Sequence, residues 1–157
     1  MPETYSIHTS VHIDASAKKV FDVLIDLNRF DEWNPFRTFD ESVTSSVTQN
    51  KPGVGSMYDY QGKKIGRGRQ LITSVDKPKL ITSDMIFFKG DAVRDTVTVE
   101  YRIVEESSGT LVTWFMEGER GFVGKFMGQI MGFDKMMGKS FALGLERLKA
   151  LVESEKK

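Results

Sequence analysis

The chain has 157 residues, with 22 basic and 22 acidic side chains, no cysteine, 11 Phe and 8 Met. A chain of this length can bury about 70% of its unfolded surface, enough for a hydrophobic core. Its equal numbers of basic and acidic residues do not indicate the basic surface that binding to nucleic acid or anionic membranes requires. Without cysteine, disulfides, thiol catalysis and thiolate metal sites are excluded. We therefore expect one domain over residues 1–157 that binds no nucleic acid.

The first elements in the chain are a strand and two short helices. Residues 4–14 alternate between apolar and polar side chains, which predicts a half-buried strand. Ser16 then offers an oxygen to cap a helix, and apolar residues follow at spacings of three and four, so a short amphipathic helix begins near Ser16. A second helical piece over residues 27–33 must end before Pro35, because proline disfavours helical geometry in the residue ahead of it.

The two histidines of the chain, His8 and His12, fall in the outer register of the first strand. Two-residue steps along a strand separate them too far to chelate a metal ion comfortably. Neither a histidine-rich metal site nor a Ser/His/carboxylate triad can therefore be assembled. We expect no metal and no cofactor.

Residues 37–119 contain six short strand-like runs separated by turn residues. Strands joined by such tight turns are typical of an antiparallel meander, and the spacing leaves no room for the crossover helices of a parallel sheet. The breaks fall at Asn50-Lys51-Pro52-Gly53, Gly62-Lys63-Lys64, Asp76-Lys77-Pro78-Lys79, Lys89-Gly90-Asp91 and Ser107-Ser108-Gly109.

From residue 121 to about residue 155 the apolar period becomes helical, which predicts one long helix that covers the sheet. A glycine stripe in its first half has three interpretations: an irregular helix start, a mobile lid over a ligand, or close approach of a partner helix. The apolar arc is Phe122, Phe126, Ile130, Phe133, Met137, Phe141, Leu148 and Leu151, and the stripe is Gly121, Gly124, Gly128 and Gly132.

Membrane association and export are not indicated by the sequence. No apolar run reaches the ~18 residues of a membrane-spanning helix. Residues 1–10 lack the charged and then apolar layout of a signal peptide. We expect a cytoplasmic protein with no integral membrane association.

Five groups of local motifs stand in the order and spacing of a known family. They are Val20-Phe21-Asp22-Val23-Leu24 with Trp33-Asn34-Pro35-Phe36; Gly53-Val54-Gly55-Ser56-Met57-Tyr58; Gly66-Arg67-Gly68; Val112-Thr113-Trp114-Phe115-Met116-Glu117-Gly118; and Asp134-Lys135-Met136-Met137-Gly138-Lys139 with Gly144-Leu145-Glu146-Arg147-Leu148-Lys149. Over nearly its whole length the chain thus resembles the START-like, or Bet v 1-like, SRPBCC superfamily, in its polyketide cyclase/dehydrase and lipid-transport branch.

The resemblance implies an α+β helix-grip fold. Its parts are a curved antiparallel sheet of about seven strands, a long C-terminal helix that the sheet surrounds, and two short helices after the first strand. Members of the superfamily bind hydrophobic ligands such as lipids, sterols, polyketides or quinones, some catalyse cyclisation or hydrolysis, and others activate chaperones. Fold alone does not choose among these functions.

Strand alternation, helped by the resemblance where the register is ambiguous, directs many aromatic and Met side chains inward. Each one alone is an ordinary core residue. The set as a whole indicates an apolar ligand cavity, because flat rings and thioethers give contact area without directional bonds. The predicted ligand contacts are Tyr58, Tyr60, Gln70, Ser83, Met85, Phe87, Tyr101, Trp114 and Met116 of the sheet, and Phe122, Phe126, Ile130, Phe133, Asp134 and Met137 of the helix.

Four polar residues share this inward register. Asp134 falls inside the apolar arc of the helix, where an unpaired carboxylate is costly. It therefore pairs with an arginine such as Arg67, Arg69 or Arg94, makes a hydrogen bond between helix and strand, or serves catalysis or ligand binding. Asp95 lies near a strand end that opens to water, and Gln70 occupies a place where relatives often carry an apolar residue. The four are Gln70, Ser83, Asp95 and Asp134.

Three functions are consistent with these features. The first is a protein that binds a small hydrophobic molecule, such as a lipid, polyketide or quinone, between helix and sheet. The second is an enzyme of cyclase or dehydratase type, in which Asp134, Asp95 or a tyrosine such as Tyr58 or Tyr101 is the general acid/base. The third is a chaperone-activator module that uses the outer face of the sheet. A homodimer is compatible with the sequence but not indicated by it.

Overall fold

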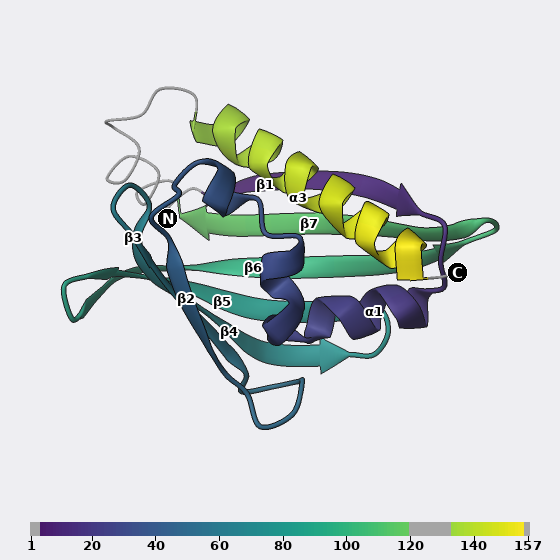
Figure 1. Ribbon diagram of the computed structural model, residues 1–157, viewed down its shortest axis with the longest axis horizontal. Helices are drawn as coiled ribbons and strands as arrows, with labels where there is room; N and C mark the ends of the chain where they lie inside the picture. The colour runs from purple at the N-terminus through teal and green to yellow at the C-terminus, as the bar shows by residue number, and fades with distance from the viewer. Residues whose placement is uncertain (1–3, 120–132, 156–157) are drawn as a thin grey trace.

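The computed structural model describes residues 4–119 and 133–155. An antiparallel sheet of seven strands curves around a layer of helices (Figure 1). The elements, in chain order, are β1 (Thr4–Ile13), α1 (Ala17–Ile25), the 3-10 helices η1 (Leu27–Glu32) and η2 (Phe36–Thr38), β2 (Thr44–Thr48), β3 (Met57–Gly62), β4 (Gly66–Asp76), β5 (Leu80–Lys89), β6 (Ala92–Glu106), β7 (Gly109–Glu119) and α3 (Phe133–Glu155).

The strand order across the sheet is β1-β7-β6-β5-β4-β3-β2, and every neighbouring pair is antiparallel. Strands β2 to β7 form the predicted meander, and β1 returns to pair with β7. Register shifts interrupt the ladder between Ile72 and Ser74 and between Phe87 and Phe88. Such bulges bend a strand and increase its twist, which helps the sheet to curve. The predicted helix-grip fold is confirmed.

The early helices begin and end where local chemistry requires. Ser16 caps α1, and its Oγ accepts a hydrogen bond from the Lys19 backbone N–H at 3.3 Å. Asp26 ends α1 and caps η1 through its own side chain. The helix predicted over residues 27–33 is therefore a 3-10 helix, and it ends before Pro35 as expected. The sequence did not predict η2.

Helix α3 lies diagonally over the side of the sheet that contains β1 and β7, and α1 and η1 lie beside it in the same layer (Figure 1). Its buried residues are Phe141, Leu145, Leu148 and Val152, whereas Lys135, Lys139 and Glu146 are exposed. The helix is amphipathic as predicted, and Phe141 and Leu148 of the predicted arc are buried, but Leu145 and Val152 are buried in addition, and Leu151 is only half-buried. The first half of the predicted helix, with the whole glycine stripe, lies outside the described residues.

The C-terminal helix is attached to the rest of the fold by polar contacts as well as apolar ones. Arg147 donates hydrogen bonds to the Asn34 carbonyl oxygen and to Thr38 Oγ1, each at 2.8 Å. Lys149 Nζ donates to the His12 carbonyl oxygen at 2.9 Å. Arg147 therefore connects α3 to the η1–η2 segment, and Lys149 connects it to β1. In the described ranges, 4–119 and 133–155, no helix has the length and apolar character needed to cross a membrane.

Candidate functional site

A cavity of about 370 Å³ lies between α3, the η1–η2 segment and the concave face of the sheet. Strands β3 to β7 contribute alternate side chains, which the sheet pleat directs to one face. The lining residues are Phe30, Asn34, Phe36, Phe39, Val43, Tyr58, Tyr60, Lys64, Ile65, Gln70, Met85, Phe87, Val99, Trp114, Met116, Met137, Ser140 and Phe141.

Many of the predicted contacts lie on the wall of this cavity. They are Tyr58, Tyr60, Gln70, Met85, Phe87, Trp114, Met116 and Met137. Ser83 and Tyr101 are buried but do not line the cavity, and both lie against Gln70. Asp95 is half-buried on β6 opposite Phe87 and does not line it either.

The remaining predicted contacts are not described at the level of side chains. Phe122, Phe126 and Ile130 lie outside the described residues, as do the side chains of Phe133 and Asp134 in the first turn of α3. Two of the arginines proposed as partners of Asp134 have partners of their own: Arg67 pairs with Asp91 at 3.4 Å, and Arg69 pairs with Asp59 at 2.7 Å. The pairing of Asp134 stays a prediction.

The lining also contains residues that the predicted contact set lacks. They are Phe30, Asn34, Phe36, Phe39, Val43, Lys64, Ile65, Val99, Ser140 and Phe141. Most of them lie on η1, on η2, or in turns, where no two-residue or helical period reveals which way a side chain points. The sequence held a signal for three of them: the motif Trp33-Asn34-Pro35-Phe36 contains Asn34 and Phe36, and the apolar arc of the helix contains Phe141.

The central wall of the cavity is a cluster of aromatic rings around Trp114. The Trp114 ring stacks on Phe141 with centroids 4.2 Å apart and planes 8° apart. It also meets Trp33 and Tyr101 edge-on, at 5.5 Å and 5.6 Å. Rings held by neighbours on several sides are fixed in orientation. This wall is therefore rigid before any ligand arrives.

A polar network supports the cavity next to Phe30. Tyr58 donates a hydrogen bond to Asp31 Oδ1 at 2.6 Å, and Asn34 Nδ2 donates to the same carboxylate and to the Tyr58 hydroxyl, both at 3.1 Å. Burial raises the pKa of Tyr58 to about 12, and the bond to Asp31 adds to this effect. Burial acts to raise the pKa of Asp31, but the hydrogen bonds from Tyr58, Asn34 and Ser45 outweigh it and lower that pKa. The network fixes η1 against β3.

A second polar contact fastens the turn between β3 and β4 at the cavity. The Asp40 carboxylate accepts hydrogen bonds from the Ser42 hydroxyl at 2.5 Å and from the backbone N–H groups of Lys64 and Ile65 at 2.8 and 3.0 Å. These bonds, led by that of Ser42, lower the pKa of Asp40 to about 2. Gly62 lets the turn approach, because a Cβ there would lie 2.4 Å from Asp40 Oδ2.

Tyrosine hydroxyls inside the fold are protonated at neutral pH. Burial raises the pKa of Tyr60 and of Tyr101. The ring of Tyr60 lies over Gly68, where a Cβ would be 2.2 Å from the hydroxyl. Glycine at this position is what lets Tyr60 lie against β4. The Tyr60 hydroxyl makes no hydrogen bond with a residue in the described ranges.

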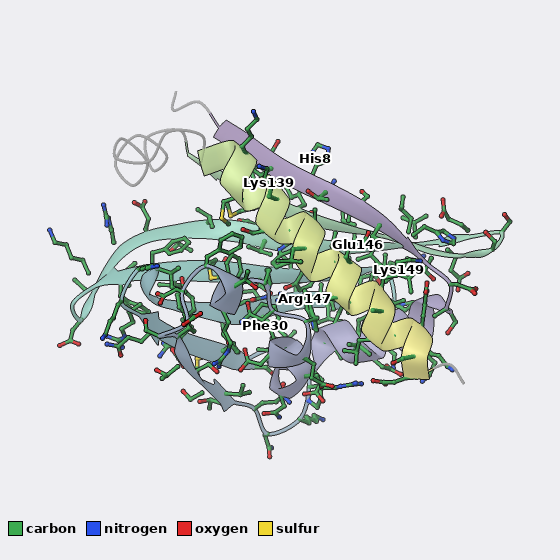
Figure 2. All side chains as sticks on the ribbon, turned by 45° about the horizontal axis from the view of Figure 1, so that its top comes forward. His8, Phe30, Lys139, Glu146, Arg147 and Lys149 are labelled. Carbon is green, nitrogen blue, oxygen red and sulfur yellow. The ribbon has the colours of Figure 1, made fainter. Side chains whose placement is uncertain are left out.

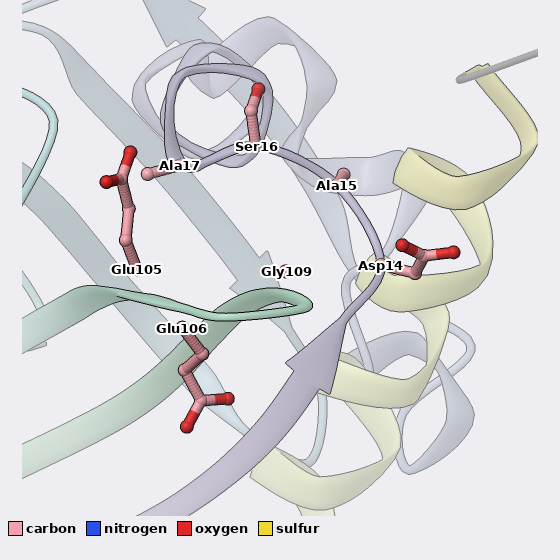
Figure 3. A pocket seen from close by; sticks show the side chains of 7 residues that line it. All are labelled: Asp14, Ala15, Ser16, Ala17, Glu105, Glu106 and Gly109. Atoms are coloured by element: carbon pink, nitrogen blue, oxygen red, sulfur yellow. The ribbon is translucent and has the colours of Figure 1, made fainter.

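A separate hollow of about 320 Å³ lies where the β6–β7 turn meets the start of α1. Figure 3 shows that its three carboxylates, from Asp14, Glu105 and Glu106, point in different directions. They do not converge on a common point. Within residues 4–119 and 133–155, no group of three His, Asp or Glu side chains could hold a metal ion.

The histidines lie where the strand alternation predicted. His8 is exposed on β1 and, in Figure 2, lies apart from Phe30, which lines the cavity. His12 is half-buried, and its Nε2 lies 3.7 Å from Glu106 Oε1. Neither histidine lines the cavity.

A comparison with family models identifies the family. A family model described as "Polyketide cyclase / dehydrase and lipid transport" matches residues 4–153. The chain belongs to this family. The resemblance to SRPBCC proteins is thereby confirmed, and with it a ligand-binding type of fold. No curated protein matched the sequence.

Several solved structures share the fold at low sequence identity. Norcoclaurine synthase from Thalictrum flavum, in complex with dopamine and hydroxybenzaldehyde, has a TM-score of 0.70 and 16% identity, over 99% of this chain and 90% of that chain. Protein Ms6760 from Mycobacterium smegmatis has a TM-score of 0.66 and 17% identity, over 96% and 92%. The Aha1 dimer from Colwellia psychrerythraea has a TM-score of 0.65 and 15% identity, over 95% and 96%. At such identities the likeness concerns the fold.

Proposed function

We propose that the protein binds a small hydrophobic molecule in the cavity between α3 and the sheet. The observation that carries the proposal is the cavity itself, about 370 Å³ in volume and lined mainly by aromatic, Met and aliphatic side chains. Small-molecule sites in proteins range over about 300–1,000 Å³, so this cavity suits a ligand of one or two rings rather than a large lipid.

The physical basis of binding is burial against a wall that is already ordered. Each buried CH₂ of a ligand contributes about 0.8 kcal/mol. Trp114 stays fixed between Phe141 and its edge-on neighbours, so binding orders few side chains and loses little conformational entropy. Norcoclaurine synthase, which has a similar fold, was solved with dopamine and hydroxybenzaldehyde, and both of these are small ring compounds.

The cavity tyrosines favour binding over acid–base catalysis. A general base works best with a pKa near the operating pH. Burial raises the pKa of Tyr58 to about 12, and the Tyr58 hydroxyl already donates its proton to Asp31. The cyclase or dehydratase hypothesis therefore rests on Asp134 and Asp95. In an Asp134→Asn variant, unchanged ligand affinity with lost turnover would favour an enzyme.

Two experiments test the binding function. Native mass spectrometry of protein purified from its source should detect a retained lipophile. A matched pair of variants on β6 then locates the site: Val99 lines the cavity, whereas Val104 is 55% exposed. Val99→Phe fills the cavity and should weaken binding of the identified molecule at least tenfold, whereas Val104→Phe should leave its affinity unchanged.

Circular dichroism checks that both variants are folded. An empty wild-type protein that also binds no added hydrophobic compound would contradict the proposal. Equal affinity in a folded Val99→Phe variant and in the wild type would place the ligand elsewhere.

A further inference from the structure

The sheet side of the cavity carries one carboxamide, that of Gln70 on β4. Gln70 lies opposite Tyr58 of β3 and Met85 of β5 in the strand register. The residue is only 1% exposed, yet it lines the cavity. A polar side chain at this place stands among aromatic and Met neighbours, so its hydrogen bonds decide whether it is stable there.

The Gln70 amide has hydrogen-bonding capacity that the residues described by the structure leave unused. A carboxamide has two N–H donors and an oxygen with two lone pairs. Nε2 contacts Ser83 Oγ and the Tyr101 hydroxyl, both at 3.4 Å, which is longer than the roughly 2.7–3.2 Å of ordinary N–H···O bonds. Oε1 accepts none of the hydrogen bonds that join the described residues.

The charge of the lining limits what a ligand can present to this amide. Among the lining residues that the structure describes, Lys64 alone carries a charge, and it is exposed on the turn between β3 and β4. An ionised group next to Gln70 would lose its hydration without a counter-ion. A neutral hydroxyl or carbonyl group would instead form a hydrogen bond with the amide and would lose little hydration free energy on entering the cavity.

We propose that the ligand is a small neutral ring compound with a hydroxyl or carbonyl group, and that Gln70 selects it by hydrogen bonding to that group. This inference rests on the proposed binding function and narrows its ligand class. Long-chain fatty acids fall outside this class, because Lys64, the one charged residue among the described lining residues, lies on the exposed turn between β3 and β4 and not beside Gln70.

Four probes of stated chemistry test the inference: naphthalene, 2-naphthol, 2-naphthoate and decanoate. Affinities follow from isothermal titration calorimetry or from quenching of Trp114, which lines the cavity. The wild type should bind 2-naphthol about tenfold more tightly than naphthalene, which corresponds to about 1.4 kcal/mol. It should bind the two anions more weakly than 2-naphthol.

Variants and NMR assign the preference to Gln70. Gln70→Leu should keep the affinity for naphthalene and lose the preference for 2-naphthol. The matched control is Gln61→Leu, because Gln61 is exposed on β3 in the opposite register to Tyr60. In the wild type, the side-chain amide resonances of Gln70 should shift more with 2-naphthol than with naphthalene, which acts on them only through its ring current. This readout needs no variant.

The outcomes separate this inference from the function on which it rests. If naphthalene and 2-naphthol bind equally, if Gln70→Leu keeps the preference, or if an anion binds most tightly, the inference is overturned while binding stands. If none of the four probes binds, the binding function fails and the inference fails with it.

Discussion

Two glycines of α3, Gly138 and Gly144, should respond in opposite ways to the same substitution. A Cβ at Gly138 would have no heavy atom within 4 Å. A Cβ at Gly144 would lie 2.9 Å from Trp114 Cζ3 and 3.1 Å from Pro35 Cδ. Neither neighbour can move easily, because the Trp114 ring is stacked on Phe141 and Pro35 is buried.

The magnitudes follow from two opposing effects. Replacing an interior helical glycine by alanine stabilises a helix by about 1 kcal/mol. Overpacking a tight interior costs typically about 1–3 kcal/mol. Gly138→Ala gains the first effect alone and should raise the free energy of unfolding by about 1 kcal/mol. In Gly144→Ala the gain in helix propensity is opposed by the cost of overpacking. Its free energy of unfolding should therefore lie between the wild-type value and about 2 kcal/mol below it.

Urea unfolding of the two variants, followed by circular dichroism, measures both values. In thermal unfolding, Gly138→Ala should raise the Tm by about 2–4 °C, as 1 kcal/mol does in a domain of this size. Both variants replace glycine by alanine in the same helix, so the gain in helix propensity cancels when the two variants are compared with each other. If Gly144→Ala stabilised the protein as much as Gly138→Ala does, the contact between α3 and the Trp114 ring would be looser than the structure has it.

Two further predictions concern the polar contacts at the cavity. The pKa of Asp40 is lowered from 3.8 to about 2, so its carboxylate stabilises the fold above pH ~4, and this stability is lost as the pH falls through about 2. Asp40→Asn should therefore be less stable at neutral pH and lose less between pH 4 and 2 in urea unfolding. The exposed control Asp91→Asn should keep the wild-type pH profile, and an unaltered profile in Asp40→Asn would refute the assignment. Tyr58→Phe removes the hydrogen bond to Asp31 and should lower the free energy of unfolding by about 1 kcal/mol. Tyr60→Phe removes a hydroxyl without a described partner and should lower the free energy of unfolding by less. If the two variants lost the same free energy of unfolding, the result would speak against a stabilising role of the Tyr58–Asp31 network.

The sequence predicted the fold well because its strong signals are periodic. Alternation over residues 4–14 and the turn residues between later runs placed all seven strands, and Ser16 marked the start of α1. The strands proved longer than expected, up to the 15 residues of β6. Backbone pairing continues past the buried stretch there, where side chains no longer alternate between core and solvent.

The candidate site was predictable only where periodicity gives each side chain a direction. Gln70 and Trp114 belong to strands, and Met137 belongs to a helix, so their register showed that they point inward. Phe30 and Lys64 lie on a 3-10 helix and in a turn, where direction depends on contacts distant in sequence. Those contacts, such as the hydrogen bonds from the turn after β3 to the Asp40 carboxylate, have no signature in the local sequence.

The pairing of β1 with β7 determines the order in which the chain can become stable. Ser10 of β1 and Thr113 of β7 are hydrogen-bonded partners 103 residues apart in sequence. Each strand from β3 to β7, in contrast, pairs with the strand that precedes it in the sequence. During synthesis, strands β2 to β7 can therefore pair one hairpin at a time, whereas β1 cannot pair until β7 has been made. Fragments that end before residue 109 lack β7, so β1 has no partner strand and α1 lies over an incomplete sheet. Such fragments should be targets for proteases and chaperones. The complete domain should unfold in one cooperative step.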